Sequence, residues 1–178
     1  MEAIFDSNAL ITTCKFSLQG APLLSLILKG CKVIIPKSVS DEVTRAKERY
    51  PDAAVAARFI SGGQLEVGEA EIPQETFLHD YKLGAGEKEA ICLYLKRKEE
   101  FDYLVTDDKL VYIVCDRMGI PKLFFLDLII AMVRGGILEH GLAKEIIELT
   151  KPRYSKGMIS HSLAILEEVK EGVQGGGS

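Results

Sequence analysis

Acidic residues follow two of the predicted strands of this chain. Asp6 comes directly after the apolar run 3–5, and Asp107 and Asp108 come directly after Leu104-Val105-Thr106. In an open parallel sheet, ligands bind at the carboxyl ends of the strands, where the next helices also present their positive amino ends. We therefore expect these carboxylates to lie at one edge of a sheet.

Further acids occur near the start of two predicted helices. Glu42 lies in the first turns of the helix after the strand at 33–36, and Glu87 and Glu89 open the helix after the turn Gly84-Ala85-Gly86. Three or four carboxylates in one pocket cannot all stay ionised without compensation, which hard divalent ions such as Mg²⁺ or Mn²⁺ supply. Such a site suits hydrolysis of a phosphodiester, because the metal activates water and stabilises the leaving oxygen.

Helix capping is the alternative interpretation of each acid taken alone. Asp6 and the pair Asp107–Asp108 could cap the helices that follow them, and Glu42 and Glu87 could be favoured by a helix dipole. Glu89 could also reach back as a capping partner. Capping alone requires several independent coincidences at one edge of one sheet, which favours a functional site.

Neighbouring polar residues can support such a site. Ser7 and Asn8 could hold a metal-bound water or a phosphate oxygen, although Ser7 could equally cap a helix. Thr106 could orient a carboxylate ligand from behind. Basic side chains that could contact substrate phosphates are Lys15, Lys37, Arg45, Lys82, Lys109 and Arg153.

The elements that must position these residues alternate between short strands and amphipathic helices. Strands are predicted at 3–5, 32–35, 103–106 and 122–125, with a further one at 64–67. Helices are predicted at 7–13, 21–28, 38–49, 52–60, 87–98, 108–117, 126–133, 142–149 and 160–170. This alternation is typical of an α/β fold in which helices cover both faces of a short, mostly parallel sheet.

Composition limits the class of protein. With 178 residues, of which 47% are hydrophobic, the chain can build one domain, predicted at 1–173, with 174–178 as a flexible tail or cloning remnant. A net charge of −4 argues against binding nucleic acid through a broad basic surface. The four cysteines show no C-x-x-C pair, so we expect neither a disulfide nor a zinc site. No secretory signal or membrane span is predicted, which suggests a cytoplasmic protein.

The ordered set of acidic motifs resembles the PIN-domain ribonucleases. The four segments are Ile4–Leu10, Ile34–Val43, Leu83–Ile91 and Val105–Lys109, which resemble the family's motifs in order and spacing. The resemblance covers a core at about 1–135, and the remaining helices to about 173 look like the helical end of prokaryotic members. It implies a three-layer, Rossmann-like PIN fold, dependence on Mg²⁺ or Mn²⁺, and cleavage of RNA in toxin–antitoxin pairs or in RNA processing. It also suggests a homodimer and an antitoxin protein as a partner.

The resemblance also suggests roles for individual acids. The expected catalytic set is Asp6, Glu42, Glu89 and Asp108, with Glu87 and Asp107 as further metal ligands. Many relatives have an acid directly before the helix alanine, which favours Glu89, whereas relatives with a Gly-Glu start favour Glu87. These two residues diverge by about 200° around a helix axis, so one of them should be the main ligand. Asp107 stands where relatives often have Asn, so it could be a ligand or only a supporting contact.

We therefore predict a metal-dependent endoribonuclease, a hydrolase that acts on phosphodiester bonds. The main alternative is a non-catalytic PIN-like module that binds RNA or protein. A metal-dependent phosphatase or a 5′ flap DNA nuclease is a second alternative, but the chain is short for the DNA-binding additions that a flap nuclease needs.

Overall fold

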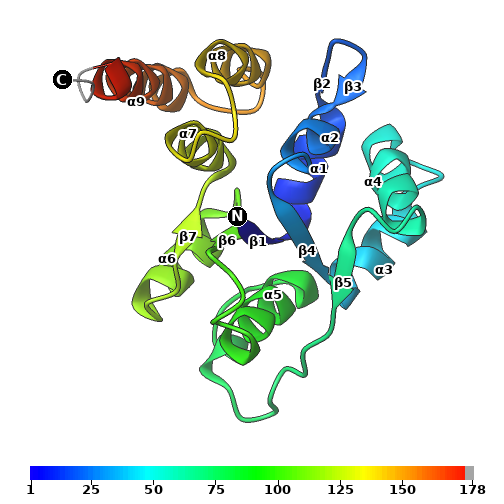
Figure 1. The fold of residues 1–178 in the computed structure, drawn as a ribbon. Helices are drawn as coiled ribbons and strands as arrows, with labels where there is room; N and C mark the ends of the chain where they lie inside the picture. The colour runs from blue at the N-terminus through cyan, green and yellow to red at the C-terminus, as the bar shows by residue number, and fades with distance from the viewer. Residues whose placement is uncertain (175–178) are drawn as a thin grey trace.

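A sheet lies at the centre of the molecule, between layers of helices (Figure 1). The computed structural model describes residues 1–174. Of the tail predicted at 174–178, Gln174 is the last residue of a helix, and residues 175–178 lie outside the described part.

Within residues 1–174, the sheet has five strands in the spatial order β5-β4-β1-β6-β7, and all neighbours are parallel. The strands are β1 (Glu2–Phe5), β4 (Lys32–Pro36), β5 (Glu66–Gly68), β6 (Tyr103–Val105) and β7 (Lys122–Leu123). The chain leaves the central β1 toward β4 on one side and later returns to β6 on the other. The carboxyl end of β1 is therefore the point where the strand order reverses, which is where open α/β sheets bind ligands.

Alternate strand residues enter two separate cores. In β1, Ala3 and Phe5 pack into one core and Ile4 packs into the other, and all three are fully buried. β4 follows the same alternation, with Ile34 on the same side as Ile4. A sheet buried on both faces requires helices on both sides, so the predicted three-layer α/β fold is confirmed.

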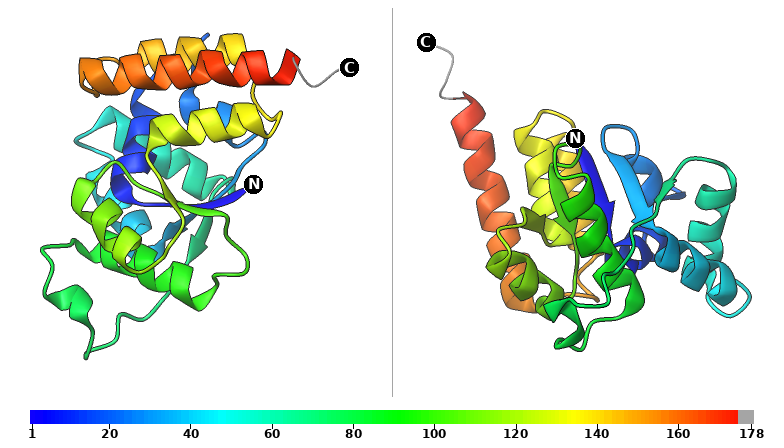
Figure 2. Two further views of the ribbon diagram at one scale, coloured as in Figure 1. Left: turned by 90° about the vertical axis from the view of Figure 1, so that its left-hand side faces the viewer. Right: turned by 90° about the horizontal axis from the view of Figure 1, so that it is seen from below.

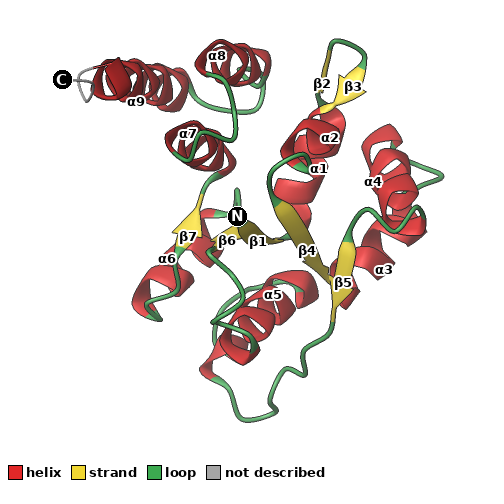
Figure 3. Cartoon of the chain, in the orientation of Figure 1, coloured by secondary structure: helices red, strands yellow, loops and turns green. Residues whose placement is uncertain are grey.

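Helices cover both faces of the sheet (Figure 3). In the described range they are α1 (Ser7–Lys15), α2 (Leu23–Ile27), α3 (Lys37–Ala46), α4 (Pro51–Ser61), α5 (Ala85–Lys96), α6 (Lys109–Arg117), α7 (Phe125–Arg134), α8 (His140–Leu149) and α9 (Lys156–Gln174), with a short 3-10 turn, η1 (Phe77–His79). α5 and α6 cover one face, while α1, α2 and α7 lie on the other, with α8 and α9 outside α7 (Figures 1 and 2). All the predicted helices are present, with ends that differ by a few residues. None of those in residues 1–174 is long and apolar enough to cross a bilayer.

A small hairpin replaces the start of the helix predicted at 21–28. β2 (Ser17–Leu18) and β3 (Ala21–Pro22) pair antiparallel through Gln19 and Gly20, whose φ angles are 53° and 79°. Positive φ at both central residues is typical of the tight turns that suit two-residue hairpins. The hairpin keeps the chain extended through Pro22, so the helix begins at Leu23 and the predicted start was wrong.

The approach of α3 to α5 depends on Gly86. A Cβ at this position would lie 2.7 Å from Cγ2 of Val39, a fully buried residue of α3. We expect Gly86→Ala to separate the two helices and to lower the free energy of unfolding by about 1–3 kcal/mol, as other overpacked cores do.

Gly141→Ala is the matched control for Gly86→Ala, because a Cβ at Gly141 in α8 would meet nothing within 4 Å. It should leave stability unchanged or raise it by up to about 1 kcal/mol. Urea unfolding followed by circular dichroism measures both effects, and similar values for the two variants would contradict the close contact.

Candidate active site

Asp6 and Asp108 cap helices at the carboxyl edge of the sheet. Asp6 Oδ1 accepts from Ala9 N at 2.8 Å at the start of α1. Asp108 Oδ1 accepts from Leu110 N at 2.6 Å and from Val111 N at 3.0 Å at the start of α6. Both aspartates therefore fulfil the capping role that the sequence offered as the alternative to a functional one.

Thr106 links these two aspartates. Its hydroxyl donates to Asp6 Oδ2 and accepts from the backbone N of Asp108 at 2.9 Å. Thr106 is fully buried at the end of β6, beside β1. The structure thus places Thr106 between the Asp6 carboxylate and the backbone of Asp108, where it can fix the position of one residue relative to the other.

Glu87 caps its own helix. α5 begins at Ala85, two residues earlier than predicted, so Glu87 is the third residue of the helix and its Oε2 accepts from Gly84 N at 2.7 Å. The third position is the one from which an acid reaches back to the helix start. The sequence had offered this reach to Glu89, and that interpretation was wrong because the predicted helix start was late.

Glu89 instead caps a different helix. Its Oε2 accepts from Ser38 N at 2.8 Å and from the Ser38 hydroxyl, and its Oε1 accepts from Ala70 N at 3.4 Å. Pro36 precedes α3 and offers no side-chain hydrogen bond to the free amide groups there. Glu89 supplies the missing acceptor, so this buried carboxylate stabilises the α3–α5 contact.

Asp107 anchors the carboxyl-terminal part of the chain. Its side chain is only 4% exposed and accepts from the Tyr154 hydroxyl at 2.7 Å, the Thr12 hydroxyl at 2.8 Å, Phe125 N at 3.3 Å and Arg153 Nε at 3.4 Å. Burial and the neighbouring Asp107 charge raise the pKa of Tyr154, which keeps its hydroxyl protonated as a donor. Asp107 therefore has a structural role as the partner of the turn between α8 and α9.

The acids differ in how much acceptor capacity remains. A carboxylate has about four lone-pair sites. The number of hydrogen bonds accepted falls along the series Asp107 (four), Glu89 (three), Asp6 (two), Asp108 (two), Glu87 (one) and Glu42 (none in the described part of the chain). We call the last four residues, Asp6, Asp108, Glu87 and Glu42, the acidic cluster, since they retain capacity for a ligand.

Electrostatic coupling connects the members of the acidic cluster. Burial raises the pKa of Asp6 to about 7, to which the charges of Asp107 and Glu87 add, against the lowering effect of its hydrogen bonds. Burial also raises the pKa of Glu87, with further increases from Asp108 and Glu42. No lysine or arginine among the described side chains forms an ion pair with a member of the cluster. The cluster therefore has an excess of acidic groups over ion-pair partners among the described side chains.

A cleft of about 550 Å³ lies beside the acidic cluster. Glu42 and Glu87 line it from α3 and α5, together with Ser7, Ser38 and Arg45. No three His, Cys, Asp or Glu side chains of the described residues stand close enough to form a complete metal site. Mg²⁺ is nevertheless commonly bound by one or two carboxylates together with water and substrate phosphates, so the oxygen donors and the excess charge here fit a hard divalent ion.

The predicted phosphate-binding residues are spread over the surface. Arg45 lines the cleft, whereas Lys37 pairs with Asp41 at 2.6 Å. Lys109 and Arg153 line a separate hollow next to Asp107. The structure places Lys15 at the far end of α1 and Lys82 before α5, and neither lines the cleft or that hollow.

Asn8 contributes through its backbone. Its carbonyl oxygen accepts from the Thr12 hydroxyl at 2.8 Å and from Arg153 Nη2 at 3.4 Å. The Asn8 carbonyl thus helps Asp107 to hold Arg153. The role that the sequence suggested for the Asn8 side chain, toward a metal-bound water or a phosphate oxygen, stays a prediction.

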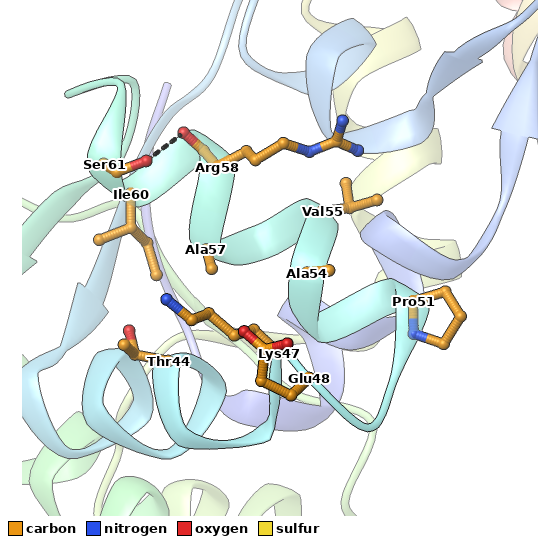
Figure 4. A pocket seen from close by; sticks show the side chains of 10 residues that line it. All are labelled: Thr44, Lys47, Glu48, Pro51, Ala54, Val55, Ala57, Arg58, Ile60 and Ser61. Carbon is orange, nitrogen blue, oxygen red and sulfur yellow. Dashed lines mark hydrogen bonds between the residues drawn. The ribbon is translucent and has the colours of Figure 1, made fainter.

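A larger hollow, of about 760 Å³, lies between α3 and α4 (Figure 4). It is lined by one acid, Glu48, together with Lys47 and Arg58, and by mostly small or apolar residues. No member of the acidic cluster lines it. Its size alone therefore does not make it the candidate active site.

The family model DUF3368, described as a PIN domain, matches residues 2–168. This chain belongs to the PIN-domain family. The PIN-domain assignment confirms the resemblance of the four motifs and gives the chain a nuclease-type fold. Among solved structures, this PIN domain is similar to a domain of a functionally unknown protein from Methanocaldococcus jannaschii DSM 2661, with 18% identity, a TM-score of 0.43, and coverage of 69% of this chain and 89% of that chain. No curated protein matches it.

Asp6→Asn should change how stability depends on pH. With a pKa raised from 3.8 to about 7, Asp6 takes up a proton in the folded PIN domain over a pH range in which the unfolded chain stays ionised. The free energy of unfolding therefore falls as pH rises through this window, by at most about 1.4 kcal/mol per pH unit. Asn keeps a good helix cap but cannot ionise. The free energy of unfolding of the variant should therefore rise relative to that of the parent as pH increases from 5 to 7.

Denaturant unfolding in EDTA at pH 5, 6 and 7 measures this difference for Asp6→Asn. Asp116→Asn, an exposed acid on α6, is the control and should show no such trend. A stability difference between Asp6→Asn and the parent that stays constant over this range would show that Asp6 is ionised throughout.

Asp107→Ala should loosen the carboxyl-terminal helices. The substitution removes the acceptor of four hydrogen bonds and leaves Arg153 and Tyr154 without their partner. We expect a loss of about 2 kcal/mol or more in stability, together with faster amide hydrogen exchange at 150–160. Asp116→Ala should change stability by less than about 1 kcal/mol. Unchanged exchange at 150–160 would mean that other contacts hold this turn.

Proposed function

We propose that this PIN domain is an endoribonuclease that depends on Mg²⁺ or Mn²⁺ and cleaves RNA at the acidic cluster. The observation that supports this most strongly is that four carboxylates with spare acceptor capacity are coupled electrostatically near the reversal point of the strand order, and that two of them, Glu42 and Glu87, line a cleft. Excess charge of this kind calls for a cation, and a nucleic-acid phosphate is the natural further ligand of that cation.

Asp6 and Asp108 are the proposed primary ligands. Thr106 and the amino end of α1 each hold one oxygen of Asp6, and the amino end of α6 holds Oδ1 of Asp108, which leaves lone pairs on both carboxylates for a cation. When bound, Mg²⁺ or Mn²⁺ supplies an activated water and positive charge for the leaving oxygen. Ser7 and Arg45 line the cleft and are the proposed contacts for a substrate phosphate, and the charge of Arg45 offsets part of the negative field.

We assign Glu87, and not Glu89, as the third acid of the site. Glu87 lines the cleft, uses one hydrogen bond and is coupled to Asp108 and Glu42. Glu89 is only 7% exposed and is held by Ser38 and Ala70. The proposal thus reverses the order that the sequence motif favoured.

RNA is proposed as the substrate because of the family resemblance. The four motifs support a nuclease, and neither the acidic cluster nor the cleft discriminates RNA from DNA by itself. An antitoxin partner and a homodimer likewise remain predictions from the resemblance.

Cleavage of unstructured, fluorescently labelled RNA and DNA oligonucleotides tests the proposal. The parent should cleave RNA with Mn²⁺ or Mg²⁺ and should lose this activity in EDTA. Glu87→Gln should lower the rate at least about tenfold. Glu71→Gln changes an exposed acid outside the cleft and is the matched control.

The variant Glu89→Gln tests whether Glu87 and Glu89 have different roles. The amide keeps one acceptor oxygen but turns the other into a donor that faces the N–H of Ala70 or of Ser38, so the substitution should lower the melting temperature more than Glu87→Gln does while the folded fraction keeps cleaving RNA. A loss of activity confined to Glu89→Gln would restore the original assignment. RNA binding without cleavage by the parent would favour the non-catalytic module, and cleavage of DNA alone would overturn the choice of substrate.

A further inference from the structure

A second hollow, of about 630 Å³, adjoins the acidic cluster on the side of α6. Asp107 lines this hollow, and Asp108, the next residue, belongs to the cluster. Consecutive Cα atoms lie only about 3.8 Å apart. Because Asp107 and Lys109, on either side of Asp108 in the chain, both line the hollow, one RNA strand can pass from the hollow to Asp108.

Aromatic side chains form one wall of this hollow. The rings of Tyr112 and Phe124 stack with centroids 4.3 Å apart and planes inclined by 1°. Lys122 Nζ lies over the Tyr112 ring, 5.1 Å from its centroid. Since Tyr112 is covered by these two neighbours, the aromatic surface most available to a ligand is that of Phe124, which is partly exposed.

Apolar and basic groups complete the hollow. Ile113 and Met158 line it and are each 37% exposed, although burial of such side chains is favourable. Lys109 and Arg153 are the basic residues of the lining, and Lys109 carries its excess positive charge because Arg153 pairs with Asp107. The one acid in the lining, Asp107, is already paired with Arg153 at 3.4 Å and has no spare acceptor capacity. An aromatic and apolar floor with a basic rim matches a nucleotide, whose base is flat and apolar on its faces and whose phosphate is negative.

We propose that this hollow binds one unpaired nucleobase of the RNA, next to the nucleotide whose phosphate lies at the acidic cluster. This inference rests on the proposed function and adds to it a preference for unpaired bases. The base stacks on Phe124 between Ile113 and Met158, while Lys109 contacts the flanking phosphate. A base in a duplex already stacks on its neighbours, so the hollow selects single-stranded or loop RNA.

Binding measurements separate this inference from catalysis. An Asp6→Asn background prevents cleavage, and fluorescence anisotropy with Mg²⁺ reports the affinity for a labelled, unstructured RNA oligonucleotide. Phe124→Leu keeps an apolar side chain but removes the ring, and it should weaken binding about fivefold or more. The same substitution should leave the affinity for an abasic sugar-phosphate oligomer unchanged.

Phe77→Leu is the matched control for Phe124→Leu. Phe77 is 50% exposed in η1 and does not line the hollow, so its loss should change the affinity less than twofold. Thermal melts verify that each variant is folded. If Phe124→Leu does not fold, Met158→Ala takes its place, because Met158 is an exposed residue that also flanks the base, and it should likewise weaken RNA binding.

Photo-crosslinking locates the base directly on the parent chain. RNA with a single 4-thiouridine, irradiated in complex with the protein and digested with trypsin, should label one of the peptides Leu110–Arg117, Leu123–Arg134 and Gly157–Lys170, which contain Ile113, Phe124 and Met158. Labels confined to other peptides would overturn the proposal.

The remaining outcomes distinguish the two proposals. RNA binding that is equal for Phe124→Leu and its background refutes the base subsite but leaves the nuclease intact. A change in oligomeric state without a change in RNA affinity would make the hollow an interface between copies of the chain, and would also refute it. Binding with the expected losses but no cleavage by the parent supports the subsite and refutes the nuclease. The absence of RNA binding by the parent refutes both.

Discussion

The requirement that exposed amide groups at helix amino ends find acceptors organises this PIN domain. The helices that begin at the carboxyl edge of the sheet each present free N–H groups there. Five of them in the described residues meet a carboxylate: Asp6 at α1, Glu89 at α3, Glu87 at α5, Asp108 at α6 and Asp107 at α7. Convergence of positive helix ends and carboxylates makes this edge both a structural joint and a candidate active site.

Capping and catalysis are therefore compatible roles for one acid. Asp6 and Asp108 each direct one oxygen to helix amides, and this fixes the carboxylate while its other lone pairs remain. Asp107 and Glu89 accept hydrogen bonds from more donors, so few lone pairs remain for a ligand and these carboxylates have a structural role. The number of hydrogen-bond donors around each carboxylate therefore distinguishes the acids that remain available to a ligand from those that only stabilise the fold.

Burial gives the acidic cluster its energetic character. Removing the Asp6 carboxylate from water disfavours its charged form more than two hydrogen bonds favour it, and the neighbouring acids add repulsion. The protein therefore gives up stability at neutral pH to keep these groups together, a cost that a bound cation would offset. The tight contact at Gly86 brings α3 and α5 together, so that Glu42 from α3 and Glu87 from α5 line the same cleft.

Local sequence patterns determined the elements and the edge at which the acids gather. Short apolar strands and amphipathic helices have recognisable periods, and Asp6 and Asp108 follow strands directly, so their place required no long-range information. Tertiary structure decided which acids remain available. Glu89 is taken by Ser38, 51 residues away in the chain, and Asp107 by Tyr154, 47 residues away. Such contacts depend on how helices that are distant in the sequence pack together. The local sequence therefore does not show which of two acids one or two residues apart remains available.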